Sequence, residues 1–187
     1  VPITSIVSQF RATIIHSFSP NWNDFSFTKP SKDHLLGIMG HTFSPNTNDQ
    51  TDSLCWVHFG FSKKYSVAKQ FSKIKLFYGK APSNCEIIFK QNDSIKHEHL
   101  AGTNVLNETL LNSSPCRIAK LILPVKHPVD LFGMSFEGNR GIILDNYSFR
   151  GISGTQLSTL NTELLKHYNA LLHYKLIVLQ YGLNVAA

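Results

Sequence analysis

The chain has 187 residues, 42% of them hydrophobic, which is enough apolar material to bury a core in one or two domains. Its 18 basic and 12 acidic residues give a net charge of +6, but the basic residues are scattered and match no nucleic-acid-binding pattern. No apolar run reaches the roughly 18 residues that a membrane-spanning helix needs. We therefore predict neither a membrane span nor a nucleic-acid partner.

Residues 1–137 are predicted to form a jelly-roll-like β-sandwich. Short apolar or alternating runs are separated by clusters of Ser, Asn, Asp, Pro and Gly, a pattern typical of strands joined by turns. The clearest run, residues 54–61, alternates between two sets of side chains, Trp56 and His58 on one face and Val57 and Phe59 on the other. Helical periodicity is nearly absent from this part of the chain.

Several aromatic side chains of this sandwich are candidate platforms for sugar rings, since an aromatic face packs well against the C–H side of a pyranose. Trp22 is the strongest candidate for substrate binding, because its neighbours Asn21, Asn23 and Asp24 are polar. Packing in the core is the alternative for each candidate. The full set is Trp22, Phe25, Phe27, Trp56, Tyr65 and Tyr78.

No metal and no cofactor are predicted. His97 and His99 share one face of a predicted strand, but no third ligand lies nearby in the sequence. A loop holding Asn48, Asp49 and Asp52 is the other place that offers oxygen ligands, in this case for calcium.

The three cysteines, Cys55, Cys85 and Cys116, lie far apart and form no C-x-x-C pair. We expect them to be buried thiols, because free cysteine is among the most frequently buried residues. One disulfide with one free thiol is the alternative.

A different pattern begins after residue 137. Continuous apolar runs at residues 142–144 and 176–181 are typical of strands buried in a parallel sheet, and between them leucines recur at helical spacing, with Thr155 or Ser158 as the expected cap. A strand, a helix and a strand form the crossover unit of such a sheet. Because two strands are too few for a sheet domain, we predict residues 138–187 to be a partial α/β domain.

Two short motifs follow these predicted strands. Gly154 lies in the turn Gly-Ile-Ser-Gly-Thr at residues 151–155, and Asn184 ends the sequence Gly-Leu-Asn. At the carboxyl ends of neighbouring parallel strands, a glycine N–H and an asparagine amide are placed to donate hydrogen bonds to one oxyanion. The alternative is a turn glycine and a loop asparagine without a catalytic role.

In this order, the two motifs resemble the second and third sequence blocks of the SGNH (GDSL-type) hydrolases, esterases and lipases on a flavodoxin-like sheet. The resemblance covers about a quarter of the chain and implies that Gly154 and Asn184 complete an oxyanion hole. The family's Gly-Asp-Ser and Asp-x-x-His blocks are not found, and Val185 stands where the family has Asp. The resemblance therefore implies an inactive fragment, with the serine upstream of Val1 and the Asp and His downstream of Ala187.

Sandwich and motifs together resemble SGNH esterases in which a carbohydrate-binding-module-like jelly roll interrupts the catalytic sheet. This implies an esterase that removes O-acetyl or other acyl groups from a polysaccharide, in a parent protein that is periplasmic or extracellular. The predicted partner is a polysaccharide or an acylated glycan. A noncatalytic glycan-binding or adhesion module is the alternative, and the basic charge allows a polyanionic glycan as the ligand.

Overall fold

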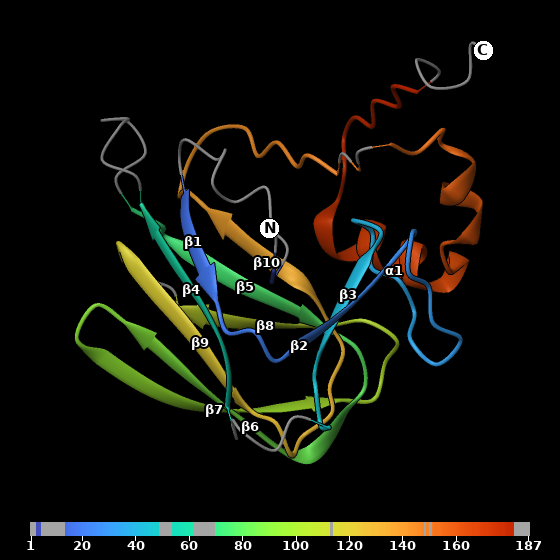
Figure 1. Ribbon diagram of the computed structural model, residues 1–187. Helices are drawn as coiled ribbons and strands as arrows, with labels where there is room; N and C mark the ends of the chain where they lie inside the picture. Colours follow the sequence, from blue (N-terminus) through green and yellow to red (C-terminus); the bar gives the residue numbers. More distant parts are fainter. Residues whose placement is uncertain are drawn as a thin grey trace.

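The computed structural model describes residues 3–4, 14–48, 54–61, 70–112, 114–147, 149 and 151–181. Two five-stranded antiparallel sheets pack face to face (Figure 1). Sheet A has the order β1 (Ile14–Phe18), β4 (Leu54–Phe61), β9 (Ile118–Pro124), β6 (Ala81–Gln91) and β7 (Ser94–Gly102). Sheet B has the order β2 (Trp22–Ser26), β3 (His41–Pro45), β10 (Leu131–Glu137), β5 (Lys73–Tyr78) and β8 (Asn107–Asn112). The mainly β sandwich predicted from the sequence is confirmed.

The core lies between the two sheets and follows from strand alternation. Val57 and Phe59 on β4 are fully buried. Trp56 and His58, which alternate with them along the strand, are half-buried and point outward, as the sequence pattern predicts. The other strands contribute in the same way, with Phe43, Leu76, Phe89, Leu121 and Leu131 in one cluster. The three cysteines also lie in this cluster as buried thiols, which confirms that expectation.

Helix α1 (Thr162–Leu172) covers part of the outer face of sheet B (Figure 1). Its two buried side chains, Leu164 and Tyr168, pack against Phe77 of β5 and Phe132 of β10. The helix is capped by Asn161, whose Oδ1 accepts a hydrogen bond from the Leu164 N–H at 2.9 Å. The expected caps instead belong to a preceding 3₁₀ helix, η2 (Thr155–Thr159).

The apolar runs on either side of the helix differ from prediction. Neither residues 142–144 nor residues 176–181 form a strand in the described part of the chain. Ile142 is 97% exposed, Leu144 89% and Val178 77%. A strand of a parallel sheet needs hydrogen-bonding neighbours and cover on both faces, and the described residues place none beside these runs. Only the helix of the predicted α/β piece is therefore present, and the domain boundary at residue 137 stays a prediction.

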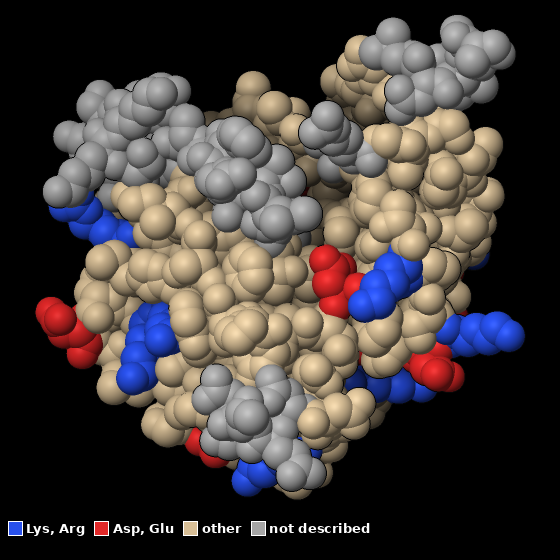
Figure 2. All heavy atoms as spheres, viewed as in Figure 1, with Lys and Arg blue, Asp and Glu red and all other residues tan. Residues whose placement is uncertain are grey.

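Charged side chains are scattered on the face of the molecule that Figure 2 shows. Figure 2 shows basic and acidic side chains in small separate groups on the face in view, with no broad basic patch. None of the described helices is long and apolar enough to cross a membrane.

Candidate functional site

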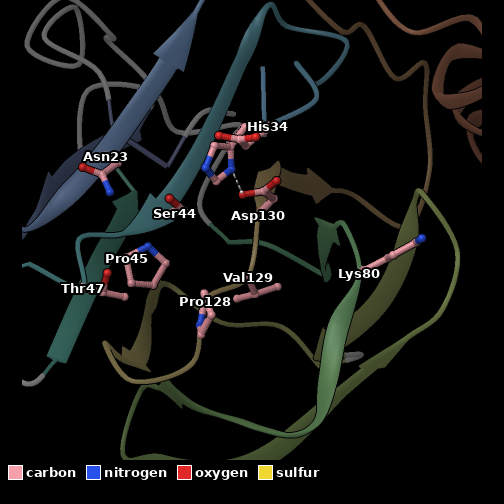
Figure 3. Close-up of a pocket in the computed structure, with 10 residues that line it drawn as sticks. Asn23, His34, Ser44, Pro45, Thr47, Lys80, Pro128, Val129 and Asp130 are labelled. Carbon is pink, nitrogen blue, oxygen red and sulfur yellow. Dashed lines mark hydrogen bonds and ion pairs between the residues drawn. The ribbon is translucent and has the colours of Figure 1, made fainter. Parts of the chain in front are cut away.

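A pocket of about 330 Å³ opens at one end of sheet B (Figure 3). Asn23 of β2 and Ser44 of β3 are direct cross-strand partners on its wall. Phe43 points into the core, so Ser44 beside it faces the opposite side of the sheet. The pocket therefore occupies the outer face of sheet B, the face whose other part is covered by α1.

An imidazole–carboxylate pair lies in the wall of this pocket (Figure 3). His34 Nδ1 and Asp130 Oδ1 are 2.7 Å apart, with 29% and 23% of the two side chains exposed. The ring of Phe25 stacks on His34 with a centroid distance of 4.1 Å and fixes its plane. Burial raises the pKa of Asp130, and the hydrogen bond with His34 offsets part of that rise. The opposite ring nitrogen of His34 has no partner among the described residues.

The loop at residues 27–40 carries His34 and is tied down by Thr42. The Thr42 hydroxyl donates to the Leu35 carbonyl, and the Gly37 N–H donates to the Thr42 Oγ1 at 3.2 Å. Gly40 ends the loop with φ +71°, where a Cβ would lie 2.1 Å from the Phe27 ring. The loop therefore requires glycine at this position, and it presents His34 in one orientation.

Asp130 is held from the other side by the turn between β5 and β6. The Gly79 N–H donates to the Asp130 carbonyl at 2.8 Å, and the Asn107 side chain donates to the Gly79 carbonyl at 2.8 Å. Lys80 in the same turn lines the pocket, but its side chain extends away from the other labelled residues (Figure 3). Both members of the imidazole–carboxylate pair are thus on segments anchored by hydrogen bonds to the backbone.

Four further polar side chains line the pocket and make no hydrogen bond to any described residue: Asn23, Asp33, Ser44 and Thr47. They supply an amide, a carboxylate and two hydroxyls. Ser44 is buried and Asn23 half-buried, whereas Asp33 and Thr47 are exposed. Buried polar groups are normally paired within the protein or with water. Their convergence on one pocket leaves them available to a polar ligand. The apolar part of the wall consists of Pro45, Pro128 and Val129.

No protein-family model and no curated protein matches this sequence. Among solved structures, the chain is similar to CpGH89CBM32-6 produced by Clostridium perfringens, with 10% sequence identity and a TM-score of 0.33. The alignment covers 64% of this chain and 94% of that chain. A TM-score this low does not establish a shared fold, so the function must be read from the pocket.

Trp22 lies beside the pocket without lining it. Its indole packs against the core and its N–H donates to the Trp56 carbonyl at 3.2 Å, while the next residue, Asn23, reaches the pocket. Of the other proposed platforms, Phe25 stacks on the pocket residue His34, and Tyr78 is 4% exposed. Tyr65 lies outside the described residues. Sugar binding by Trp22 stays a prediction.

The structure places one member of the predicted oxyanion pair. Gly154 adopts φ +99° directly before η2, and its N–H donates to no described residue. Asn184 lies outside the described residues, but Tyr181, three positions earlier, contacts Gly154: a Cβ on Gly154 would lie 2.7 Å from the Tyr181 Cγ. Tyr181, the residue before the second motif, therefore lies against Gly154, and the catalytic roles of Gly154 and Asn184 stay predictions.

Neither of the two places considered for a cation shows a set of metal ligands among the described residues. His97 Nδ1 is 2.6 Å from Glu86 Oε1, and this hydrogen bond lowers the pKa of Glu86. The described residues contain no group of three or more side chains suited to hold a metal ion. In the other loop, Asn48 is described, whereas Asp49 and Asp52 lie outside the described residues.

Proposed function

We propose that the β-sandwich is a glycan-binding module and that the pocket at His34 and Asp130 is its sugar site. The observation that carries this proposal is the set of four polar side chains around that pair that make no hydrogen bond to a described residue, above all the buried Ser44 and the half-buried Asn23. Sugar hydroxyls both donate and accept hydrogen bonds, so a sugar site needs amide, hydroxyl and carboxylate groups together. Ligand pockets commonly measure about 300–1,000 Å³, and the 330 Å³ found here suits a single sugar residue of a chain.

Binding accounts for this pocket better than catalysis does. An activated nucleophile needs a hydrogen bond to its base, and the base needs a third group to orient it. Asp130 orients His34, but the hydroxyl of Ser44 makes no hydrogen bond to the imidazole. The pair therefore offers a donor or acceptor and a charge to a ligand.

Titration of acylated and deacylated polysaccharides into the protein tests the proposal, with calorimetry as the readout. Asn23→Ala combined with Ser44→Ala removes two contacts worth about 0.5–1.5 kcal/mol each. We expect roughly tenfold weaker binding, since tenfold corresponds to about 1.4 kcal/mol. The matched control is Ser83→Ala with Asn84→Ala, an exposed pair on β6. Equal binding by the unsubstituted protein and the variant with Asn23→Ala and Ser44→Ala, or no glycan binding at all, contradicts the proposal.

A second function is favoured by the contact between Gly154 and Tyr181. We propose that Gly154 and Asn184 donate hydrogen bonds to the oxyanion of an SGNH-type ester hydrolase whose serine, histidine and aspartate come from polypeptide outside this sequence. The serine would attack the ester carbonyl, and the two donors would stabilise the charge that develops on its oxygen. The sandwich would hold the glycan while its acyl group enters the site.

Asn184→Ala tests this second function in a longer protein that also contains the serine, histidine and aspartate. Loss of one oxyanion donor typically costs about 2.7–4 kcal/mol in the barrier, or roughly 10²–10³ in rate. We expect kcat for a chromogenic acetyl ester to fall by that factor with little change in KM, because the donor acts in the transition state. An unchanged kcat would exclude the role.

A further inference from the structure

The outer face of sheet A carries a row of basic side chains that crosses three strands. His58 of β4 pairs with Lys120 of β9, which in turn pairs with Lys90 of β6. Adjacent strands lie about 4.8 Å apart, so the three side chains are immediate neighbours. We name His58, Lys120 and Lys90 the basic row.

The basic row lacks compensating charge. Neither lysine has a carboxylate within ion-pair distance among the described residues. Glu86 is the one acidic residue at an outward position of sheet A in the described strands, and it is already hydrogen-bonded to His97. Like charges placed opposite each other destabilise a sheet. A counter-charge supplied by a ligand would remove that cost.

An apolar row runs beside the basic row. Its members lie on the same three strands, each two residues along the strand from a member of the basic row. They are Trp56 of β4, its cross-strand partner Ile122 of β9, and Ile88 of β6, which pairs with Ile122. The Lys120 Nζ lies 4.4 Å from the centroid of the Trp56 ring, so the two rows are in contact. The Lys120 ammonium group therefore covers one face of the indole, and together with Lys90 it offers cations to the acidic substituents of a sugar chain.

We propose that the outer face of sheet A binds an anionic polysaccharide through carboxylate groups at Lys90 and Lys120. Charge complementarity selects this occupant. Binding of single-stranded nucleic acid uses several aromatic side chains on which successive bases stack, whereas this face has one indole between aliphatic neighbours. The surface lies on the sheet opposite to the pocket, so the inference does not depend on glycan binding there.

Affinity electrophoresis and calorimetry with polygalacturonate, a carboxylated polysaccharide, test the proposal. Lys90→Gln combined with Lys120→Gln should weaken binding at least tenfold and flatten its dependence on salt. Lys73→Gln is the matched control, because Lys73 is exposed on β5 of the other sheet and has no ion-pair partner among the described residues. It should leave the affinity unchanged. Thermal melting checks that all variants remain folded.

Three results would overturn the proposal. These are unchanged affinity of the double lysine variant, equal binding of a neutral galactan, and displacement of polygalacturonate by an equal concentration of oligothymidylate. The pocket variant with Asn23→Ala and Ser44→Ala should keep its affinity for polygalacturonate. Failure of this inference can therefore be told apart from failure of the pocket proposal.

Discussion

Gly154→Ala tests whether Gly154 touches Tyr181, the residue before the Gly-Leu-Asn sequence. Gly154 has φ +99°, a conformation that costs other residues roughly 1–2 kcal/mol. A Cβ there would also lie 2.7 Å from the Tyr181 Cγ, inside normal contact distance. Overpacking of this kind typically costs about 1–3 kcal/mol. The two costs are separable, because only the second one needs the tyrosine ring.

We expect Gly154→Ala to destabilise this segment by about 2–5 kcal/mol, the sum of the two costs. In a Tyr181→Ala background the same substitution should cost only the roughly 1–2 kcal/mol of the backbone. Gly151→Ala is the control, since Gly151 has φ +87° with nothing within 4 Å of its Cβ position. Its cost should be the same with and without the Tyr181 ring.

Hydrogen exchange of two amides provides the local readout. The Leu157 N–H donates to the Gly154 carbonyl at 3.1 Å, and the Leu160 N–H donates to the Leu157 carbonyl at 3.2 Å. Protection of both amides reports the opening free energy of this turn. Additivity of Gly154→Ala and Tyr181→Ala within about 0.5 kcal/mol would mean no contact between the residues. The ester hydrolase proposal would then lose its structural support.

Asp130→Asn should leave the protein at least as stable as the parent at pH 7. Burial raises the pKa of Asp130, so the stability of the unsubstituted protein falls as pH rises through and above the ordinary carboxyl range. Any stability advantage of the variant, measured by denaturant unfolding, should therefore vanish in acid. Tyr168→Ala should cost about 3–5 kcal/mol in urea unfolding, because the tyrosine is 2% exposed and its ring packs against Phe77 and Phe132; Tyr168→Phe keeps the ring and should cost less, and equal costs would contradict this account. Lys120→Gln should raise the pKa of His58 in an NMR titration, because burial and then the Lys120 charge lower it in the parent. The lowered pKa of His58 also means that the parent loses stability as pH falls below the ordinary imidazole range, and this loss should be smaller in the variant.

The sequence predicted the sandwich because alternation is a local property. The run at residues 54–61 has one apolar and one mixed face whatever its partners are, and that is enough to predict a half-buried strand. The pocket has no such signal. His34 and Asp130 are 96 positions apart and meet because β3 pairs with β10 and the loop before β3 folds back over Phe25. The pairing order of the strands is a global property.

The apolar runs at residues 142–144 and 176–181 show the complementary limit of sequence patterns. Composition can indicate that a segment would be stable when buried, but burial itself requires neighbours on both sides. The described residues place no strand beside either run, so the same side chains stand exposed. Trp22 and Asn23 show the same limit for single residues. Successive side chains of a strand point to opposite faces, so the Trp22 indole packs against the core and the Asn23 amide lines the pocket.

The pocket depends on residues that follow the sandwich in sequence. Its loop supplies His34 to the pocket and Ile38 to the apolar cluster under α1, where Tyr168 is 2% exposed. Phe149 stacks on His41, the residue after this loop, with a centroid distance of 4.9 Å. A displacement of α1 would therefore remove packing from the loop that orients His34. The loop that orients His34 and helix α1 thus share one packed layer on the outer face of sheet B.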